Sequence, residues 1–193
     1  VMRFVGASAH MSTGTAVVAS TPFATDDNDF ENARSLVALV EYGRFRYHWG
    51  GDLMGDGPDI EGHLVATAGD HFYGPLGMDV THAHHHVRRT SSNAAFVDAM
   101  APLDGLSRNV VGGINGGHVG SPHLDVLQRW GDSDRLGMGA IWITRSAPGG
   151  DDHPALIDAD ANVVVQTVGA GSGYRVQAAR EAAPMSRTFS TVR

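Results

Sequence analysis

Short apolar and polar segments alternate along this chain, and glycines or prolines separate most of them. Runs rich in β-branched and apolar residues between such breaks predict strands. The runs 35–42 and 45–49 stand on either side of Gly43, and they predict an antiparallel hairpin that ends in Gly50-Gly51-Asp52. Further strands are predicted at 15–19, 78–83, 108–114, 140–144, 161–168 and 174–176.

Three other segments have apolar residues at helical spacing. They cover 59–69, 92–100 and 122–130, with Ser92 or Asn93 expected to cap the second helix. Strand, polar loop and helix therefore follow one another, and the polar residues come just after strand ends. In layered α/β folds ligands bind at this rim, because strand ends and helix starts leave backbone groups available there. The pattern predicts an α/β fold with its chemistry at the strand ends.

Composition narrows the class of protein. The chain of 193 residues, 42% of them hydrophobic, fits one domain over 1–193, with a loosely ordered tail from about 180. A net charge of −7 argues against a dedicated nucleic-acid-binding surface. Because the chain has no cysteine, His, Asp, Glu and water are the ligands left for any metal. No apolar stretch is long enough to span a bilayer and no signal peptide is evident, so we expect a soluble chain without membrane insertion, in an unassigned compartment.

Four histidines lie at one strand end: His82 is within the predicted strand 78–83, and His84, His85 and His86 follow it before the predicted helix 92–100. Such a density of imidazole favours a metal or phosphoryl site over a purification tag or solvated and core histidines. Alternation along the strand allows at most two of the four to point into one site. Asp52 follows two glycines at the end of the hairpin, where its carboxylate either bridges divalent ions or caps the next segment.

A second group of polar residues follows the histidines. Thr90 and Ser91 could orient a ligand histidine, hold a phosphate or cap the following helix. Asn115, His118 and His123 flank a glycine-rich loop that enters a helix, whose free N–H groups could accept an anion. These five residues are the candidates for contacting substrate.

An ordered set of motifs extends over roughly residues 30 to 145. The set resembles the C-terminal half of the metallo-β-lactamase-fold hydrolases of the ComEC-like competence type. The resemblance implies an αββα sandwich in which Asp52 bridges metal ions and His85 binds one of them. The motifs are Glu31–Val37, Gly51-Asp52-Leu53, Glu61, His85-His86, Thr90-Ser91, Ala101-Pro102 and the segment from Asn115 to Leu127.

The chain also departs from the pattern of that family. Val87-Arg88 stands where the family has Gly-Ser, and Ser121 stands where it has a histidine, which leaves His118 or His123 as substitutes. The leading His-x-His-x-Asp-His motif of the family is absent from this sequence. The chain therefore looks like a sandwich that lacks its N-terminal metal-binding half. Asp52 with one or two histidines would leave a zinc ion short of protein ligands.

Two functional hypotheses follow. The first is a metal-dependent hydrolase, with zinc or alternatively manganese, that cuts a phosphodiester or related ester, nucleic acid being one such substrate by family analogy. Its catalytic residues would be Asp52, His85 and His86, with His86, His118 or His123 orienting substrate or protonating the leaving group. The second is a non-catalytic binding domain with an incomplete metal site. An acyl-transfer enzyme ranks last, because the sequence has no Gly-x-Ser-x-Gly elbow.

The half-sandwich interpretation carries one further expectation. The sheet face on which the other half would pack should be apolar and exposed. We therefore expect association, either with a missing N-terminal half or with a second copy of the chain.

Overall fold

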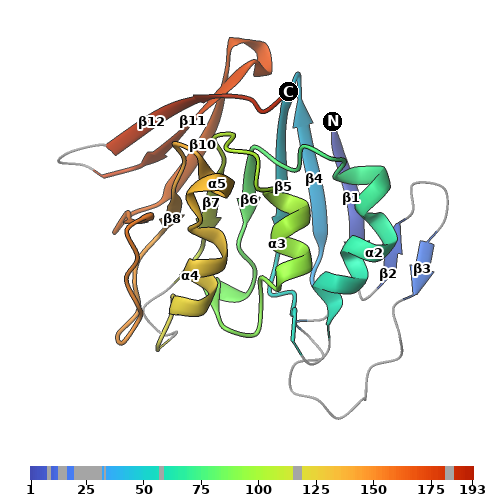
Figure 1. Cartoon of the computed structure of the whole chain (residues 1–193), viewed down its shortest axis with the longest axis horizontal. Helices are drawn as coiled ribbons and strands as arrows, with labels where there is room; N and C mark the ends of the chain where they lie inside the picture. Colours follow the sequence, from blue (N-terminus) through green and yellow to red (C-terminus); the bar gives the residue numbers. More distant parts are fainter. Residues whose placement is uncertain are drawn as a thin grey trace.

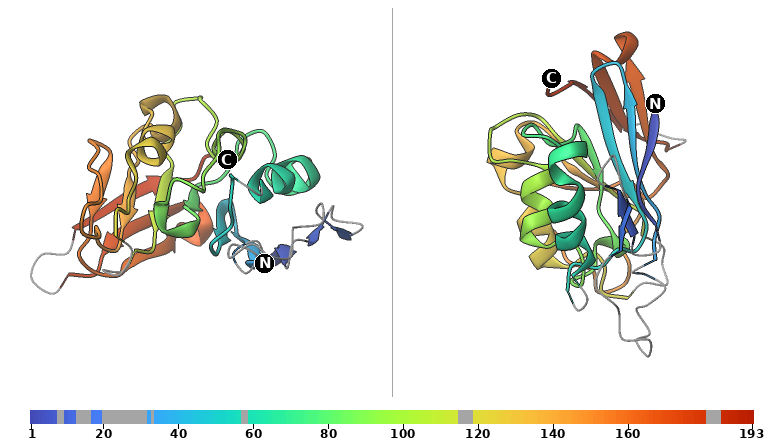
Figure 2. Two further views of the ribbon diagram at one scale, coloured as in Figure 1. Left: turned by 90° about the horizontal axis from the view of Figure 1, so that it is seen from below. Right: turned by 90° about the vertical axis from the view of Figure 1, so that its right-hand side faces the viewer.

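A mixed β-sheet forms the centre of the protein, with helices on one face and a smaller sheet against the other (Figures 1 and 2). The computed structural model describes residues 1–7, 10–12, 17–19, 32, 34–56, 59–114, 119–180 and 185–193. This architecture confirms the predicted α/β class. Among the described residues, no helix is long and apolar enough to cross a membrane.

The larger sheet has the strand order β3-β2-β1-β4-β5-β6-β7-β8-β9. Its first part, up to β5, is antiparallel, and from β5 onwards neighbouring strands are parallel. The predicted hairpin is confirmed as β4 and β5, and Gly43 provides the positive φ of 59° that its turn requires. The strands are β1 (Met2–Ala7), β2 (His10–Ser12), β3 (Val17–Ala19), β4 (Val37–Tyr42), β5 (Phe45–Gly50), β6 (Val80–His82), β7 (Asn109–Gly112), β8 (Ile141–Ile143) and β9 (Leu156–Asp158).

Helices α2 (Ile60–Phe72), α3 (Ala94–Met100) and α4 (Leu124–Trp130) cover one face of this sheet, in agreement with the three predicted helices (Figure 1). Asp59 caps α2 by accepting from the Gly62 amide, and Asn93 caps α3 by accepting from the Phe96 amide. Their buried apolar side chains join those of the strands in one core. The described residues also form a short helix, α5 (Ser133–Leu136), and the 3₁₀ turns η1 (His85–Val87) and η2 (Gly169–Gly171).

The smaller sheet packs on the opposite face of β5 to β8 (Figure 2). It consists of β10 (Val163–Val168), β11 (Gly173–Ala178) and β12 (Met185–Ser190). The ring of Tyr174 lies 5.3 Å from Phe45 of the larger sheet and 5.3 Å from Phe189 of β12. The expectation of a loosely ordered tail from about 180 is therefore wrong for residues 185–190. They form a strand because β11 offers an edge with which they pair in antiparallel register.

Candidate functional site

The candidate residues gather at one rim of the larger sheet. Strands β5, β6 and β7 are parallel neighbours, so their C-terminal ends lie at the same edge. Asp52 follows the end of β5, the η1 turn with His85 and His86 follows the end of β6, and Gly113 follows β7. The strand order thus brings together residues that lie far apart in the sequence, as the sequence pattern predicts.

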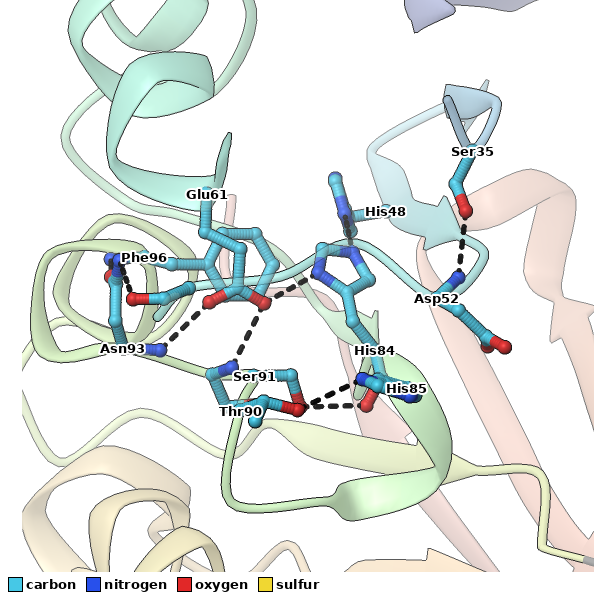
Figure 3. A network of polar contacts seen from close by, with 12 residues as sticks. Ser35, His48, Asp52, Glu61, His84, His85, Thr90, Ser91, Asn93 and Phe96 are labelled. Carbon is cyan, nitrogen blue, oxygen red and sulfur yellow. Dashed lines mark hydrogen bonds and ion pairs between the residues drawn. The ribbon is translucent and has the colours of Figure 1, made fainter. Parts of the chain in front are cut away.

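The central contact at this rim joins His86 to Asp52. The Nε2 atom of His86 lies 3.3 Å from Oδ2 of Asp52, and both side chains are partly exposed. The Nδ1–H of His86 donates to the Gly113 carbonyl at 2.6 Å, because a carbonyl oxygen only accepts. This bond fixes the ring so that Nε2 faces the carboxylate. The Asp52 backbone is held in turn by a bond from its amide to Ser35 Oγ at 2.9 Å (Figure 3).

The two partners shift one another's pKa in opposite directions. The hydrogen bond from His86 is the main cause that holds the pKa of Asp52 below its usual value, against the effect of burial. The hydrogen bond to Asp52 is the main cause that raises the pKa of His86 above its usual value. The pair therefore favours a carboxylate next to a protonated imidazole at a rim that solvent can reach.

His85 is held by different partners. Its Nδ1 lies 3.0 Å from Thr90 Oγ1, and its Nε2 lies 3.4 Å from the side-chain nitrogen of Asn32. The side-chain nitrogen of Asn32 can only donate, so Nε2 of His85 is the acceptor of that bond. Nδ1 of His85 therefore carries the hydrogen and donates it in a hydrogen bond to Thr90 Oγ1. Thr90 thus orients a histidine, which is one of the three roles open to it from the sequence.

The turn that carries the two histidines has an unusual backbone. His85, His86 and Val87 have positive φ angles of 49°, 57° and 58°. This left-handed region costs an L-residue roughly 1–2 kcal/mol, and it is least favourable for a β-branched side chain such as that of Val87. Such strain persists only where the surroundings hold it, and it is concentrated at functional sites. The region predicted from the histidine cluster is therefore strained in the structure.

Hydrogen bonds close this turn on both sides. The Ser91 hydroxyl shares its one proton between the carbonyls of His84 at 2.8 Å and Arg88 at 2.9 Å, so Ser91 closes the turn, whereas Asn93 caps α3. The amide of His123 at the start of α4 donates to the Val87 carbonyl at 3.1 Å. His123 thus supports the turn through its backbone. Asn115 and His118, the other candidates in that loop, lie outside the described residues.

A buried polar network lies directly behind the turn (Figure 3). Glu61 on α2 accepts from the amides of Ser92 and Asn93, both at 2.8 Å, and its Oε1 lies 2.7 Å from His84 Nδ1. His84 Nε2 lies 2.9 Å from Nε2 of His48 on β5. Sequence reasoning missed this network. The available signals were Glu61 in the first turn of a predicted helix and His48 between two aromatic residues of a predicted strand.

Two further histidines are kept neutral by burial. Burial, followed by the charges of His84 and His82, lowers the pKa of His48 well below its usual value. Burial is also the main cause that lowers the pKa of His82 to about 4. Both residues have a buried Nδ1 with no hydrogen-bond partner among the described residues. Both residues thus lie among the buried side chains behind the rim.

The donor atoms at the rim match a divalent cation in type but not in number. Asp52 offers a carboxylate, and His85 offers its Nε2 while its Nδ1–H donates to Thr90 Oγ1, an arrangement that orients a histidine ligand. However, the described part of the chain contains no group of three or more His, Cys, Asp or Glu side chains placed to hold a metal ion. A catalytic zinc takes three protein ligands. The described residues alone therefore do not complete a zinc site.

Comparison of the chain with models of protein families, with curated proteins and with solved structures gave no match. The functional argument therefore rests on the residues and geometry of this chain.

Proposed function

We propose that this chain is a divalent-cation-dependent hydrolase, using zinc or manganese, that cleaves a phosphodiester or a related ester at the rim formed by Asp52 and the η1 turn. The observation that carries the proposal is the 3.3 Å contact between Asp52 and His86, on a strained turn at the C-terminal edge of parallel strands. A carboxylate and an imidazole with fixed orientation at a solvent-accessible rim are the parts that ester hydrolysis needs.

Each residue has a definite task in this proposal. Asp52 stays ionised and stabilises a proton on His86 Nε2. His86 then donates that proton to the oxygen of the leaving group, for which its raised pKa suits it. His85, oriented by Thr90, and Asp52 provide donor atoms for the cation. When bound, the cation would supply an activated water and offset the negative charge of the phosphate.

The layered structure is compatible with the finer fold that the sequence suggests. Helices, a mixed sheet and a second sheet lie in that order. Of the motifs that resemble the metallo-β-lactamase fold, Gly51-Asp52-Leu53 and His85-His86 follow the ends of β5 and β6 in the mixed sheet. We therefore propose an αββα metallo-β-lactamase-like sandwich without its N-terminal metal-binding half. The remaining ligands would come from outside the described residues, for instance from His118 or from another polypeptide.

The test is hydrolysis of a chromogenic phosphodiester by the purified chain, together with its metal content. We expect stoichiometric zinc or manganese, turnover that a chelator abolishes and the metal restores, and a loss of roughly 100-fold or more in Asp52→Asn and His86→Gln. Asp125→Asn, on the exposed side of α4, is the matched control and should retain activity. Metal content well below one ion per chain, with no chelator-sensitive turnover, would refute the proposal.

The incomplete donor set favours one second candidate, a non-catalytic binding domain. In that case the same assay would show ligand or metal binding that depends on Asp52 but no turnover. The two candidates are thus separated by turnover and not by binding.

A further inference from the structure

Arg129, in the last turn of α4, binds the main chain beside the η1 turn. Its Nη1 donates to the Ser91 carbonyl at 3.2 Å and to the Ser92 carbonyl at 2.5 Å. Nε of the same guanidinium donates to the backbone carbonyl of Asp125 at 3.0 Å, which fixes the side chain along its own helix. Asp125→Asn keeps that bond, because the acceptor is a main-chain oxygen. A single nitrogen of Arg129 thus holds two consecutive carbonyls of the segment that follows the turn.

This segment is held by a charged group on each side. The carbonyls of Ser91 and Ser92 face Arg129 on α4. The amides of Ser92 and Asn93 face the Glu61 carboxylate on α2. Hydrogen bonds to charged groups contribute more than those between neutral groups. Ser92 also has a positive φ of 57°, a strained conformation that persists only where the surroundings hold it. Arg129 and Glu61 hold it from opposite sides.

Helix α4 contacts the turn at a second point. The amide of His123, the N-cap residue of α4, donates to the Val87 carbonyl at 3.1 Å. The helix therefore binds the chain both within the η1 turn and just after it. Three fully buried side chains anchor α4 in the core: Val126, Leu127 and Trp130. A helix fixed in the core thus braces both ends of the segment from Val87 to Ser92.

Thr90 connects the braced segment to His85. Its Oγ1 accepts the Nδ1–H of His85 at 3.0 Å, and its carbonyl accepts from the Gly55 amide at 2.8 Å. Gly55 belongs to the loop that follows Asp52. The position of Thr90 is therefore set on one side by that loop and on the other side by the residues that Arg129 holds. With the hydrogen on Nδ1, the lone pair of His85 is on Nε2, which is a form of imidazole that binds cations.

We propose that Arg129 is a positioning residue for His85. It holds the two carbonyls that follow Thr90, and Thr90 in turn keeps the hydrogen of His85 on Nδ1. Arg129 bonds to main-chain atoms of this segment, so it acts on the imidazole through Thr90. The use of His85 as a cation ligand rests on the proposed function, whereas the tautomer of His85 does not.

The test is the tautomer of His85 in the full chain without added metal, determined from the chemical shifts of its two ring nitrogens by NMR. The measurement is made at about pH 8.5, well above the reference pKa of imidazole. We expect the hydrogen on Nδ1 in the unmodified protein. Arg129→Met, and Arg129→Gln, whose amide ends two atoms short of Nη1, should shift His85 toward the Nε2–H form. Thr90→Val, which removes the acceptor, should do the same. Circular dichroism verifies that each variant is folded.

Arg135→Met serves as the control for a purely structural effect. Arg135 on α5 also donates to a backbone carbonyl, that of Ala101 at 2.8 Å, and forms an ion pair with Asp98 at 2.6 Å. It makes the same kinds of contact as Arg129 but none with the turn segment. Its replacement should leave the tautomer of His85 unchanged. An unchanged tautomer in a folded Arg129 variant, or the same shift in Arg135→Met, would overturn the proposal.

The affinity for Zn²⁺ separates this inference from the proposed function. We expect Arg129→Met and Thr90→Val each to weaken Zn²⁺ binding by about 10–100-fold, as the loss of an outer-shell partner does. The double variant should bind no more weakly than Thr90→Val alone, because Arg129 acts through Thr90. Additive losses would overturn that route. If the unmodified chain binds no Zn²⁺, the proposed hydrolase is refuted, and the tautomer measurement still decides the role of Arg129.

Discussion

Oε1 of Glu61 lies 2.7 Å from Nδ1 of His84, and neither side chain has any exposure to solvent. This contact connects the first turn of α2 to the residue that precedes the strained turn. Through its other bonds Glu61 also holds the amides of Ser92 and Asn93 at the start of α3. One buried carboxylate therefore fixes both ends of the segment that carries His85 and His86.

Glu61→Ala should destabilise the protein strongly. It leaves two buried amides and one imidazole nitrogen without their acceptor, and losses of this kind cost about 3–5 kcal/mol. Glu61→Gln keeps the volume and one acceptor oxygen, so its loss should be smaller. Urea unfolding measures both. Asp98→Ala, which removes an exposed ion pair with Arg135, is the control and should cost less than about 1 kcal/mol. Equal losses for Glu61→Ala and Asp98→Ala would show that the buried network is not needed.

Asp52→Asn should lower the pKa of His86. The hydrogen bond to Asp52 is the main cause of the raised value, so removal of the carboxylate charge removes most of the shift. The contribution of His86 to stability is present below its unfolded pKa and is lost as pH rises through the raised folded pKa. The contribution of Asp52 to stability is present above the pKa of Asp52 in the unfolded chain, and it is lost as pH falls through the lowered pKa of the folded state. Histidine side-chain NMR during a pH titration follows the change, and an unaltered His86 pKa would contradict the pairing.

Gly112→Ala should displace the strained turn. A Cβ at Gly112 would lie 2.5 Å from Cγ2 of Val87 and 3.3 Å from Cγ2 of Ile143. Overpacking of a buried site costs about 1–3 kcal/mol. Val87→Ala in the same chain removes the clashing methyl group, so the double variant should be more stable than the sum of the two single losses predicts. Additive losses in urea unfolding would show that the two sites do not contact one another.

Acid should destabilise the protein through its buried histidines. His48 and His82 stay neutral when folded but take up a proton when unfolded, so stability is lost as pH falls from 6.5 through about 4, the pKa of His82. In His82→Gln the free energy of unfolding should therefore change less with pH between about pH 7 and about pH 5. The idea fails if His82→Gln keeps the full slope.

Much of the fold could be predicted from local patterns. The hairpin of β4 and β5 and helices α2, α3 and α4 each have a long apolar period and a turn or cap residue in the sequence, and each is present. β9 and α5 are too short to show a period. β12 was missed because Phe189 is its one buried side chain, so its pattern is almost entirely polar. Its strand conformation comes from pairing with β11, which is a long-range contact.

The site could be predicted less completely. Asp52 and the histidine pair were found because glycine and histidine are distinctive residues at predicted strand ends. The network of Glu61, His84 and His48 joins α2, the turn and β5, and no local pattern encodes such a junction. One feature pointed to the left-handed backbone at Val87: the family that the sequence resembles has glycine at this position. A glycine there would have indicated positive φ directly, whereas valine concealed it.

The most direct test of the central claim is a titration of the purified chain with Zn²⁺ while the side-chain resonances of its histidines are followed by NMR. We predict that the resonances of His85 and His86 change, that those of the buried His48 and His84 do not, and that Asp52→Asn abolishes the change. If His85 and His86 do not respond, or if all the histidines respond alike, the claim that Asp52 and the η1 turn form a cation-dependent site is contradicted.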